Sequence, residues 1–426
     1  MDIPMDRNAP ELPGRGNRVS ARSGAVQAGG GKPAPRPAIE PFLVKFSGSG
    51  GTYFRIWIVN VLLTVITLGL YAPFARRRTA RYFYGETLVA DSPLEFTARK
   101  GRMFVGFLLM LAMVLVYQLA AGSGQVAVTG VLLFGAALAA PWLWGNAMRF
   151  RLASTRWRGV RLQFRARWAE VYQASWPVFA IALTWTIVAG AVISIGGDPA
   201  GMADASPYLQ GLAVLLVMAA LVATVLCFIQ LEFNYKRLLV ARALVGDQPG
   251  HWKPVYRDFV HIWASAFALF IACTAATLGL PALVLSMFFS SAAGTLGLGI
   301  LVFAPLLFLV ALGAIWLLAV LPAWAYREAR MFQLVWNNVG VSHLARFRCD
   351  LGVRDFVLLR MRNTLLTYLT LGFFRPFAMV SEYRMKAESV TVLVKGGVDQ
   401  LVGQLAVQGG ALGDAAADAV GLDLIG

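Results

Sequence analysis

Two triplets of polar residues lie inside apolar stretches, each with a spacing that places three side chains on one helix face. The triplets are Asn60, Thr64, Thr67 and Asn363, Thr367, Thr370. Amide and hydroxyl groups arranged in this way can line a site for a solute or an ion between two repeats, because broken helices also expose backbone groups. The same groups can instead join helices, at about 0.6 kcal/mol for each hydrogen bond. Both interpretations stay open.

Each triplet belongs to one copy of a repeated segment. Residues 60–75 (NVLLTVITLGLYAPFA) and 363–378 (NTLLTYLTLGFFRPFA) are identical at ten of sixteen positions. Glycine and proline interrupt helices, so each copy predicts a helix break. The predicted breaks are at Gly69, Pro73, Gly372 and Pro376.

Basic residues flank both copies of the repeat on both sides. A helix that crosses a membrane once should instead show more basic residues on one side. This pattern favours a broken helix that re-enters the side from which it came, or lies at the interface. The alternative is a full crossing, for which the uncharged stretch 56–75 is long enough.

The composition is that of a membrane protein. Apolar residues make up 58% of the 426 residues and charged residues only 14%, against about 25% in soluble chains. Uncharged spans lie at 56–75, 103–120, 126–148, 174–195, 208–231, 262–289, 296–321 and 363–374. The connections 121–125, 196–207 and 290–295 lack Lys and Arg, whereas the other long connections are basic. The positive-inside rule therefore predicts three helical hairpins with a basic cytoplasmic side.

We predict an all-α polytopic membrane protein with an internal repeat. It would have six full transmembrane helices, two broken helices that re-enter or span, and short cytoplasmic β-strands. The predicted strands are 42–46, 87–90, 94–97, 160–164, 339–347 and 390–394. The predicted regions are a disordered tail at 1–40, a membrane domain at 41–396 and a flexible tail at 397–426.

The net charge of +16 raises the question of nucleic-acid binding. No nucleic-acid-binding signature accompanies the charge, and the arginines adjoin apolar spans. We therefore expect the partners to be the bilayer and its anionic phospholipids, with protein partners unknown. The expected headgroup contacts are Arg76, Arg77, Arg78, Arg149 and Arg151.

The motifs of common enzymes are absent from the sequence. It contains no phosphate-binding loop, no HExxH, no GxSxG and no paired catalytic carboxylates at a recognisable spacing. Its three cysteines and three histidines lack the spacing of metal ligands. We expect no catalytic residue, no metal and no cofactor.

A longer pattern resembles a known family. The run Tyr53 to Pro73, with YFRIW, Asn60, LLT and TLGLY, resembles the YjgN family of bacterial inner-membrane proteins. The stretches at 76–87 and 155–161 are similar to the blocks that follow in that family. The similarity covers about residues 42–396. It departs at Thr52, where the family commonly has an acidic residue, and at Phe74 and Phe377, where Trp is common.

This resemblance implies a multi-pass protein of the bacterial inner (plasma) membrane, in a family of unknown function. Two functions remain open on the sequence. One is a transporter or channel-like protein that uses the polar triplets. The other is a non-transporting membrane scaffold, or envelope-organising protein, that binds lipids or partners through its basic cytoplasmic face.

Overall fold

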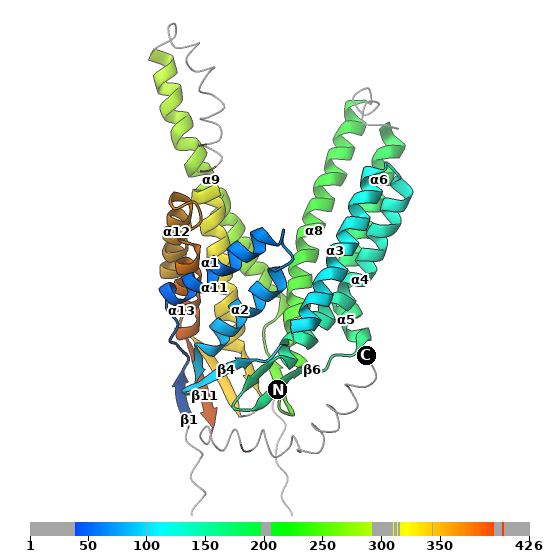
Figure 1. The fold of residues 1–426 in the computed structure, drawn as a ribbon. Coiled ribbons are helices and arrows are strands. Elements are labelled where there is room, and N and C mark those ends of the chain that lie inside the picture. Colours follow the sequence, from blue (N-terminus) through cyan, green and yellow to red (C-terminus); the bar gives the residue numbers. More distant parts are fainter. Residues whose placement is uncertain are drawn as a thin grey trace, which may run out of the picture. The chain divides into compact units, whose positions relative to one another are not determined.

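The computed structural model describes residues 39–98, 100–196, 206–291, 316–342 and 344–395, together with residues 310, 313 and 403. Helices and short strands alternate along the chain (Figure 1). The helices are α1 Gly50–Ile66, α2 Ala72–Gly85, α3 Lys100–Gly122, α4 Val126–Ala153, α5 Trp168–Ala174, α6 Trp176–Gly196, α8 Pro207–Ala241, α9 Tyr256–Ser291, α11 Leu321–Asn338, α12 Val353–Leu369 and α13 Arg375–Glu388. A π-helical turn, Trp316–Val320, leads directly into α11.

All the described strands belong to one 11-stranded antiparallel sheet, in the order β1-β11-β10-β9-β8-β7-β6-β5-β4-β3-β2. They are β1 Ile39–Leu43, β2 Lys45–Phe46, β3 Thr87–Val89, β4 Ser92–Phe96, β5 Thr155–Trp157, β6 Val160–Phe164, β7 Ala243–Val245, β8 Gln248–Trp252, β9 Val339–Val341, β10 Ala345–Cys349 and β11 Val390–Lys395.

The two ends of this sheet are formed by one short stretch of chain. Strand β1 pairs with β11, and β2 pairs with β3. Only Val44 separates β1 from β2, and its N–H donates to the Val390 carbonyl at 3.0 Å. The sheet therefore nearly closes on itself. Residues from several parts of it meet in one apolar cluster, which includes Trp157, Val160 and Val392.

The prediction of an all-α fold with a few short strands was wrong, because the strands form a single nearly closed sheet. Strands β5, β7 and β8 were missed, and the predicted strand 339–347 is divided into β9 and β10. Each strand is two to six residues long, too short for alternation to be distinctive beside long apolar helices. At least one pairing partner of each strand also comes from a distant part of the sequence.

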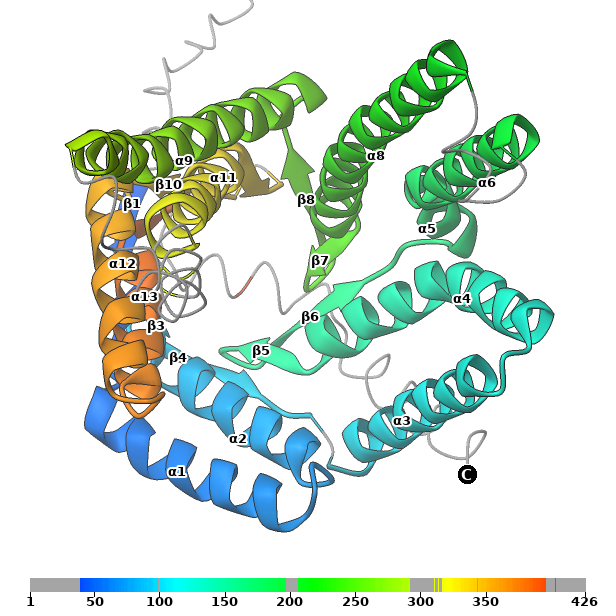
Figure 2. The same cartoon turned by 90° about the horizontal axis from the view of Figure 1, so that it is seen from above.

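Tight turns join the strands into hairpins and fix their pairing. Ala90 and Asp91 both have positive φ in the β3–β4 turn, as do Arg158 and Gly159 in the β5–β6 turn. Two such residues match a type I′ turn, whose twist matches that of the flanking strands. Each hairpin connects one group of helices to the next, so the helices surround the sheet when viewed from above (Figure 2).

Five described helices are long and apolar enough to cross a membrane. They contain the candidate spans 103–122, 128–153, 176–194, 207–241 and 256–279, which match predicted spans. The predicted span 296–321 lies mostly outside the described residues. Strands β3 to β10 lie in the basic connections, so the positive-inside rule predicts that the sheet lies on the cytoplasmic side.

The helices of the repeat fold back on themselves. Near the base of the first pair, the N–H of Ser47 donates to the Glu86 carbonyl at 3.0 Å. Asp350 and Ser389 form the equivalent bond at 2.9 Å. In each pair the start of the first helix thus lies beside the end of the second. This geometry corresponds to the re-entrant alternative, because a single crossing would separate the two ends.

Candidate functional site

The two copies of the repeat build the same helical hairpin. Helices α1 and α12 have 17 residues each, and α2 and α13 have 14 each. At the break, Leu68 and Gly69 have positive φ, as do Leu371 and Gly372. Glycine adopts this conformation readily, which explains its place in both turns. Pro73 and Pro376 lie in the first turn of the following helix, where a missing N–H costs little. They start α2 and α13.

The threonines of both triplets are engaged within their own hairpin. Thr67 donates to the Leu63 carbonyl at 2.8 Å and accepts the N–H of Tyr71 at 2.9 Å. Thr370 makes the equivalent contacts with Leu366 and Phe374, at 2.7 and 2.9 Å. Thr64 and Thr367 donate to the carbonyls of Asn60 and Asn363 at 2.6 and 2.7 Å. The hydroxyl groups therefore stabilise the break and the helix before it.

Each asparagine joins the two arms of its hairpin. Asn60 Nδ2 donates to the Ala75 carbonyl at 3.5 Å, and Asn363 Nδ2 donates to the Ala378 carbonyl at 3.4 Å. Both side chains are buried, with 5% and 1% of their surface exposed. Asn60 Oδ1 accepts from Arg78 at 3.4 Å, whereas Asn363 Oδ1 has no hydrogen-bond partner among the residues that the structure describes.

The two hairpins contact each other through aromatic side chains. The rings of Phe54 and Phe377 stack at 5.7 Å, and those of Trp57 and Phe373 meet at 6.5 Å. Arg384 also donates to the Gly48 carbonyl at 2.6 Å. Among the described residues, no hydrogen bond connects one polar triplet to the other.

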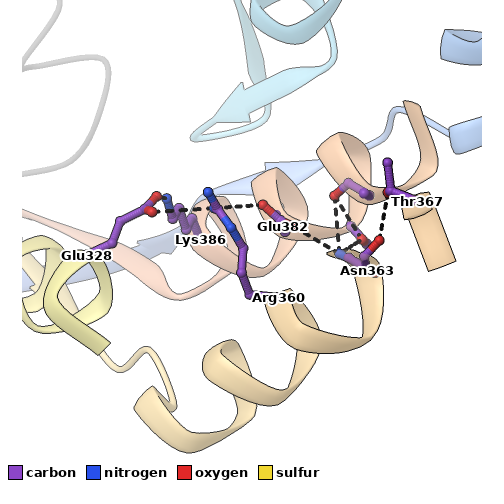
Figure 3. Close-up of polar contacts among 8 residues, drawn as sticks. Glu328, Arg360, Asn363, Thr367, Glu382 and Lys386 are labelled. Atoms are coloured by element: carbon purple, nitrogen blue, oxygen red, sulfur yellow. Dashed lines mark hydrogen bonds and ion pairs between the residues drawn. The ribbon is translucent and has the colours of Figure 1, made fainter. Parts of the chain in front are cut away.

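A charged cluster adjoins Asn363 (Figure 3). Arg360 Nη1 lies 2.8 Å from Glu382 Oε2 and 3.4 Å from Glu328 Oε2. Lys386 contacts Glu328 from the other side. Asn363 Nδ2 donates to Glu382 Oε1 at 3.1 Å, and to Ser381 Oγ at 2.9 Å. The cluster therefore ties α11, α12 and α13 together.

Burial raises the pKa of the Glu382 carboxyl group above its usual value of 4.5. Arg360 and the hydrogen bond from Asn363 lower that pKa, but their combined effect is smaller than that of burial. Glu382 is thus a half-buried acid that holds its proton more tightly than an exposed glutamate.

A second charged cluster lies next to the first, on the other side of α11. Glu232 pairs with Lys236 at 2.7 Å and with Arg327 at 3.1 Å, and it accepts from Trp263 Nε1 at 2.9 Å. The Arg327 guanidinium also stacks on Trp263 and Trp324, at 4.5 and 4.4 Å. A cavity of about 250 Å³ is lined by residues of both clusters. The chain thus places a continuous charged network at the base of its helices.

The Glu382 cluster was not predicted from the sequence. The signal was the alignment of the two copies. Arg360, Glu382 and Lys386 occupy the positions of Trp57, Thr79 and Phe83 in the first copy. Three charges that replace uncharged side chains in a repeated hairpin indicate a local charged interface.

The arginines expected at lipid headgroups differ in their surroundings. Arg77 donates to the Ala98 carbonyl at 2.7 Å, and Arg78 donates to Asn60 and to Tyr71. Arg149 donates to the Ala166 carbonyl and stacks on Trp168. Arg76 and Arg151 are exposed. Neither forms an ion pair with a residue in the described part of the chain.

Comparisons with known proteins identify relatives. The chain is 32% identical over 158 residues to the inner membrane protein YjgN of Salmonella typhimurium, a match covering 36% of this chain and 40% of that protein. The proteins of the same name from Escherichia coli O157:H7 and strain K12 are 27% and 28% identical over 150 residues, which cover 35% of this chain and 37% of each relative. No solved structure matches the chain.

These relatives confirm the resemblance to the YjgN family and the assignment to the bacterial inner membrane. The matched stretches span about two fifths of the length of the relatives. A longer match comes from a family of bacterial proteins of unknown function, DUF898, which extends over residues 42–419. The chain therefore belongs to the DUF898 family, bacterial proteins whose function is unknown.

Proposed function

We propose that this protein is a non-transporting membrane scaffold that anchors its two repeated hairpins at the cytoplasmic interface and gathers anionic phospholipids at its basic side. One observation carries the proposal: the Asn and Thr side chains of both triplets are bonded within their own hairpins. A solute path lined by these groups would need them to be available. Their engagement supports a structural role.

The surface of the hairpins supports anchoring. Leu68 and Leu371, at the two breaks, are 94% and 91% exposed. Arg76 and Arg362 are exposed on the same hairpins. Apolar side chains can enter the acyl region while long arginine side chains reach back to the phosphates. This combination suits a hairpin lying at the boundary between headgroups and acyl chains.

The proposal is tested by measuring how deep in the bilayer the two helix breaks lie. Leu68→Cys and Leu371→Cys would each carry an environment-sensitive fluorophore in protein reconstituted into nanodiscs. We expect lipids brominated near the headgroup to quench both labels more strongly than lipids brominated near the end of the acyl chain. A label at Leu215→Cys, an exposed residue of the spanning helix α8, should show the opposite preference.

A label at Asp91→Cys, in the β3–β4 turn, provides the aqueous control and should respond to dissolved iodide. Quenching of the labels at 68 and 371 by iodide alone would contradict anchoring. A second measurement tests the non-transporting role. If the wild type carried a solute flux in proteoliposomes, and the folded double variant Asn60→Ala, Asn363→Ala did not, that role would be contradicted.

A further inference from the structure

A polar cavity of about 450 Å³ lies between α9 and α11, where both helices leave the sheet. Strand β8 leads into α9 and β9 follows α11, and the register pairs Trp252 with Val339. The beginning of α9 is therefore adjacent to the end of α11. The cavity is lined by residues from both helices, among them Asp258, Arg330 and Asn337.

The charged groups of this cavity are separated along the helices. Asp258 lies in the first turn of α9, and Asn337 lies in the last turn of α11, so both are at the sheet end. Arg330 precedes the end of α11 by eight residues, or about 12 Å. The cation is therefore nearer the membrane and the carboxylate nearer the cytoplasm.

The cation of this cavity is not neutralised by a carboxylate. Arg330 is exposed, and its described contacts are Gln333 Oε1 at 3.5 Å and the Tyr326 ring at 5.7 Å. Most described carboxylates at the base of the helices are already in ion pairs, as in the two clusters above. An exposed guanidinium at headgroup level suits a phosphate group.

The carboxylate is held in place by the start of α9. One oxygen of Asp258 accepts the Val255 N–H at 3.0 Å, which caps the helix. The other oxygen accepts no hydrogen bond from the residues that the structure describes. A second negative charge beside this carboxylate would be repelled, whereas an ammonium group with N–H donors would be attracted.

We propose that this cavity binds the headgroup of a zwitterionic phospholipid that carries a primary ammonium, of the phosphoethanolamine class. The phosphate lies at Arg330, and the ammonium reaches Asp258, because the Asn337 side chain is already bonded to the Cys349 backbone. The acyl chains run away from the sheet along the face of α9 that continues the cavity lining, past Leu269, Ala272 and Ala276. This orientation follows the order of the charges along the two helices.

This site lies on the same basic side that the scaffold proposal assigns to anionic lipids, but it would select a different headgroup. Its selectivity comes from one cation and one anion that follow each other along the helices. Each faces the oppositely charged group of the headgroup. Phosphatidylcholine lacks the N–H donors, and phosphatidylglycerol lacks the positive charge. Both should bind more weakly than phosphatidylethanolamine.

The test measures phospholipid retention by native mass spectrometry after reconstitution with equal amounts of phosphatidylethanolamine, phosphatidylcholine and phosphatidylglycerol. We expect Arg330→Ala to lower the retained phosphatidylethanolamine about tenfold, the effect of one charge-assisted hydrogen bond. Arg346→Ala, which removes an exposed arginine of β10 outside the cavity, should retain the wild-type amount. Arg330→Gln gives the same comparison if the alanine variant does not fold.

Asp258→Asn tests the ammonium contact, because the asparagine carbonyl oxygen can still accept the Val255 N–H that Asp258 accepts. This variant should lose the preference for phosphatidylethanolamine over phosphatidylcholine and keep the dependence on Arg330. Equal retention by the Arg330→Ala and Arg346→Ala variants would overturn the proposal. So would equal binding of dissolved O-phosphoethanolamine and the lipid, which would indicate a soluble ligand. The protein could instead fail to enrich anionic lipids and still prefer phosphatidylethanolamine at this cavity. That result would contradict only the scaffold proposal.

Discussion

The two copies of the repeated hairpin share one backbone but have different interiors. In the first copy, Tyr53 packs against Tyr82 and Phe83, with ring centroids 5.3 and 4.9 Å apart. In the second copy, the centre of the corresponding face holds the ion pairs of Arg360, Glu382 and Lys386. The break and the Asn and Thr contacts are the same in both.

This difference separates what builds the hairpin from what connects it to its neighbours. Asn, two threonines, glycine and proline recur because each has a role within the hairpin itself. The other faces differ because their partners differ. The first copy packs its rings against Phe46 and Tyr383, while the second copy meets Glu328 of α11. A repeat can thus conserve its turn and change the chemistry of its interface.

The largest effect is expected from Arg360→Met. The change leaves the carboxylates of Glu328 and Glu382 without their shared cation, and uncompensated buried charge should lower the free energy of unfolding by about 3 kcal/mol. Chemical unfolding in detergent measures the loss. Trp57→Met, at the matching position of the first copy, should cost only about 1 kcal/mol, because it removes packing alone.

Adding Glu382→Gln to Arg360→Met should recover part of the lost stability, because it neutralises one of the carboxylates. Arg360→Met could instead lower the free energy of unfolding no more than Trp57→Met does. The charged cluster would then stabilise the second hairpin no more than packing stabilises the first, and the inferred difference between the two copies would be wrong.

A smaller difference is expected between the two asparagines. Asn363→Ala removes the donor to Ser381, Glu382 and the Ala378 carbonyl and should cost about 2–3 kcal/mol. Asn60→Ala loses one long bond to Ala75 and one from Arg78 and should cost about 1 kcal/mol. The same unfolding measurement ranks the two variants. If Asn60→Ala lowered the free energy of unfolding more than Asn363→Ala, the proposed difference between the two asparagines would be wrong.

Much of the membrane topology could be predicted from the sequence, because its signals are long or repeated. The five described spans coincide with uncharged stretches. The near identity of 60–75 and 363–378 also indicated that both copies form the same broken helix. These features depend on local composition, which a single chain displays directly.

The sheet and the charged cluster could not be predicted in the same way, because they depend on contacts between distant segments. Strand β2 has two residues, Lys45 and Phe46, and nothing local marks their place at one end of a large sheet. Glu328 meets Lys386 across 58 positions of sequence. The hydroxyls of Thr64 and Thr67 had two possible roles, and only the backbone geometry shows which bonds they make.

The smallest effect concerns pH and is confined to the second copy. Burial raises the pKa of Glu382 in the folded protein, and Arg360, Glu328 and Lys386 are the charged groups around it. Because the folded state then binds the proton more tightly than the unfolded state, this carboxyl group adds stability at low pH. That contribution is complete below the unfolded pKa and is lost as the pH rises through the folded pKa.

Plots of the free energy of unfolding against pH should therefore differ in slope between the wild type and Glu382→Gln just above the usual pKa of glutamate. The wild type should lose stability relative to the variant as the pH rises from the unfolded pKa of glutamate through the higher folded pKa of Glu382. Thr79 occupies this position in the first copy, so Thr79→Val should leave the pH dependence unchanged. Parallel wild-type and Glu382→Gln curves would contradict the raised pKa, because they would show that Arg360 and the bond from Asn363 fully offset burial.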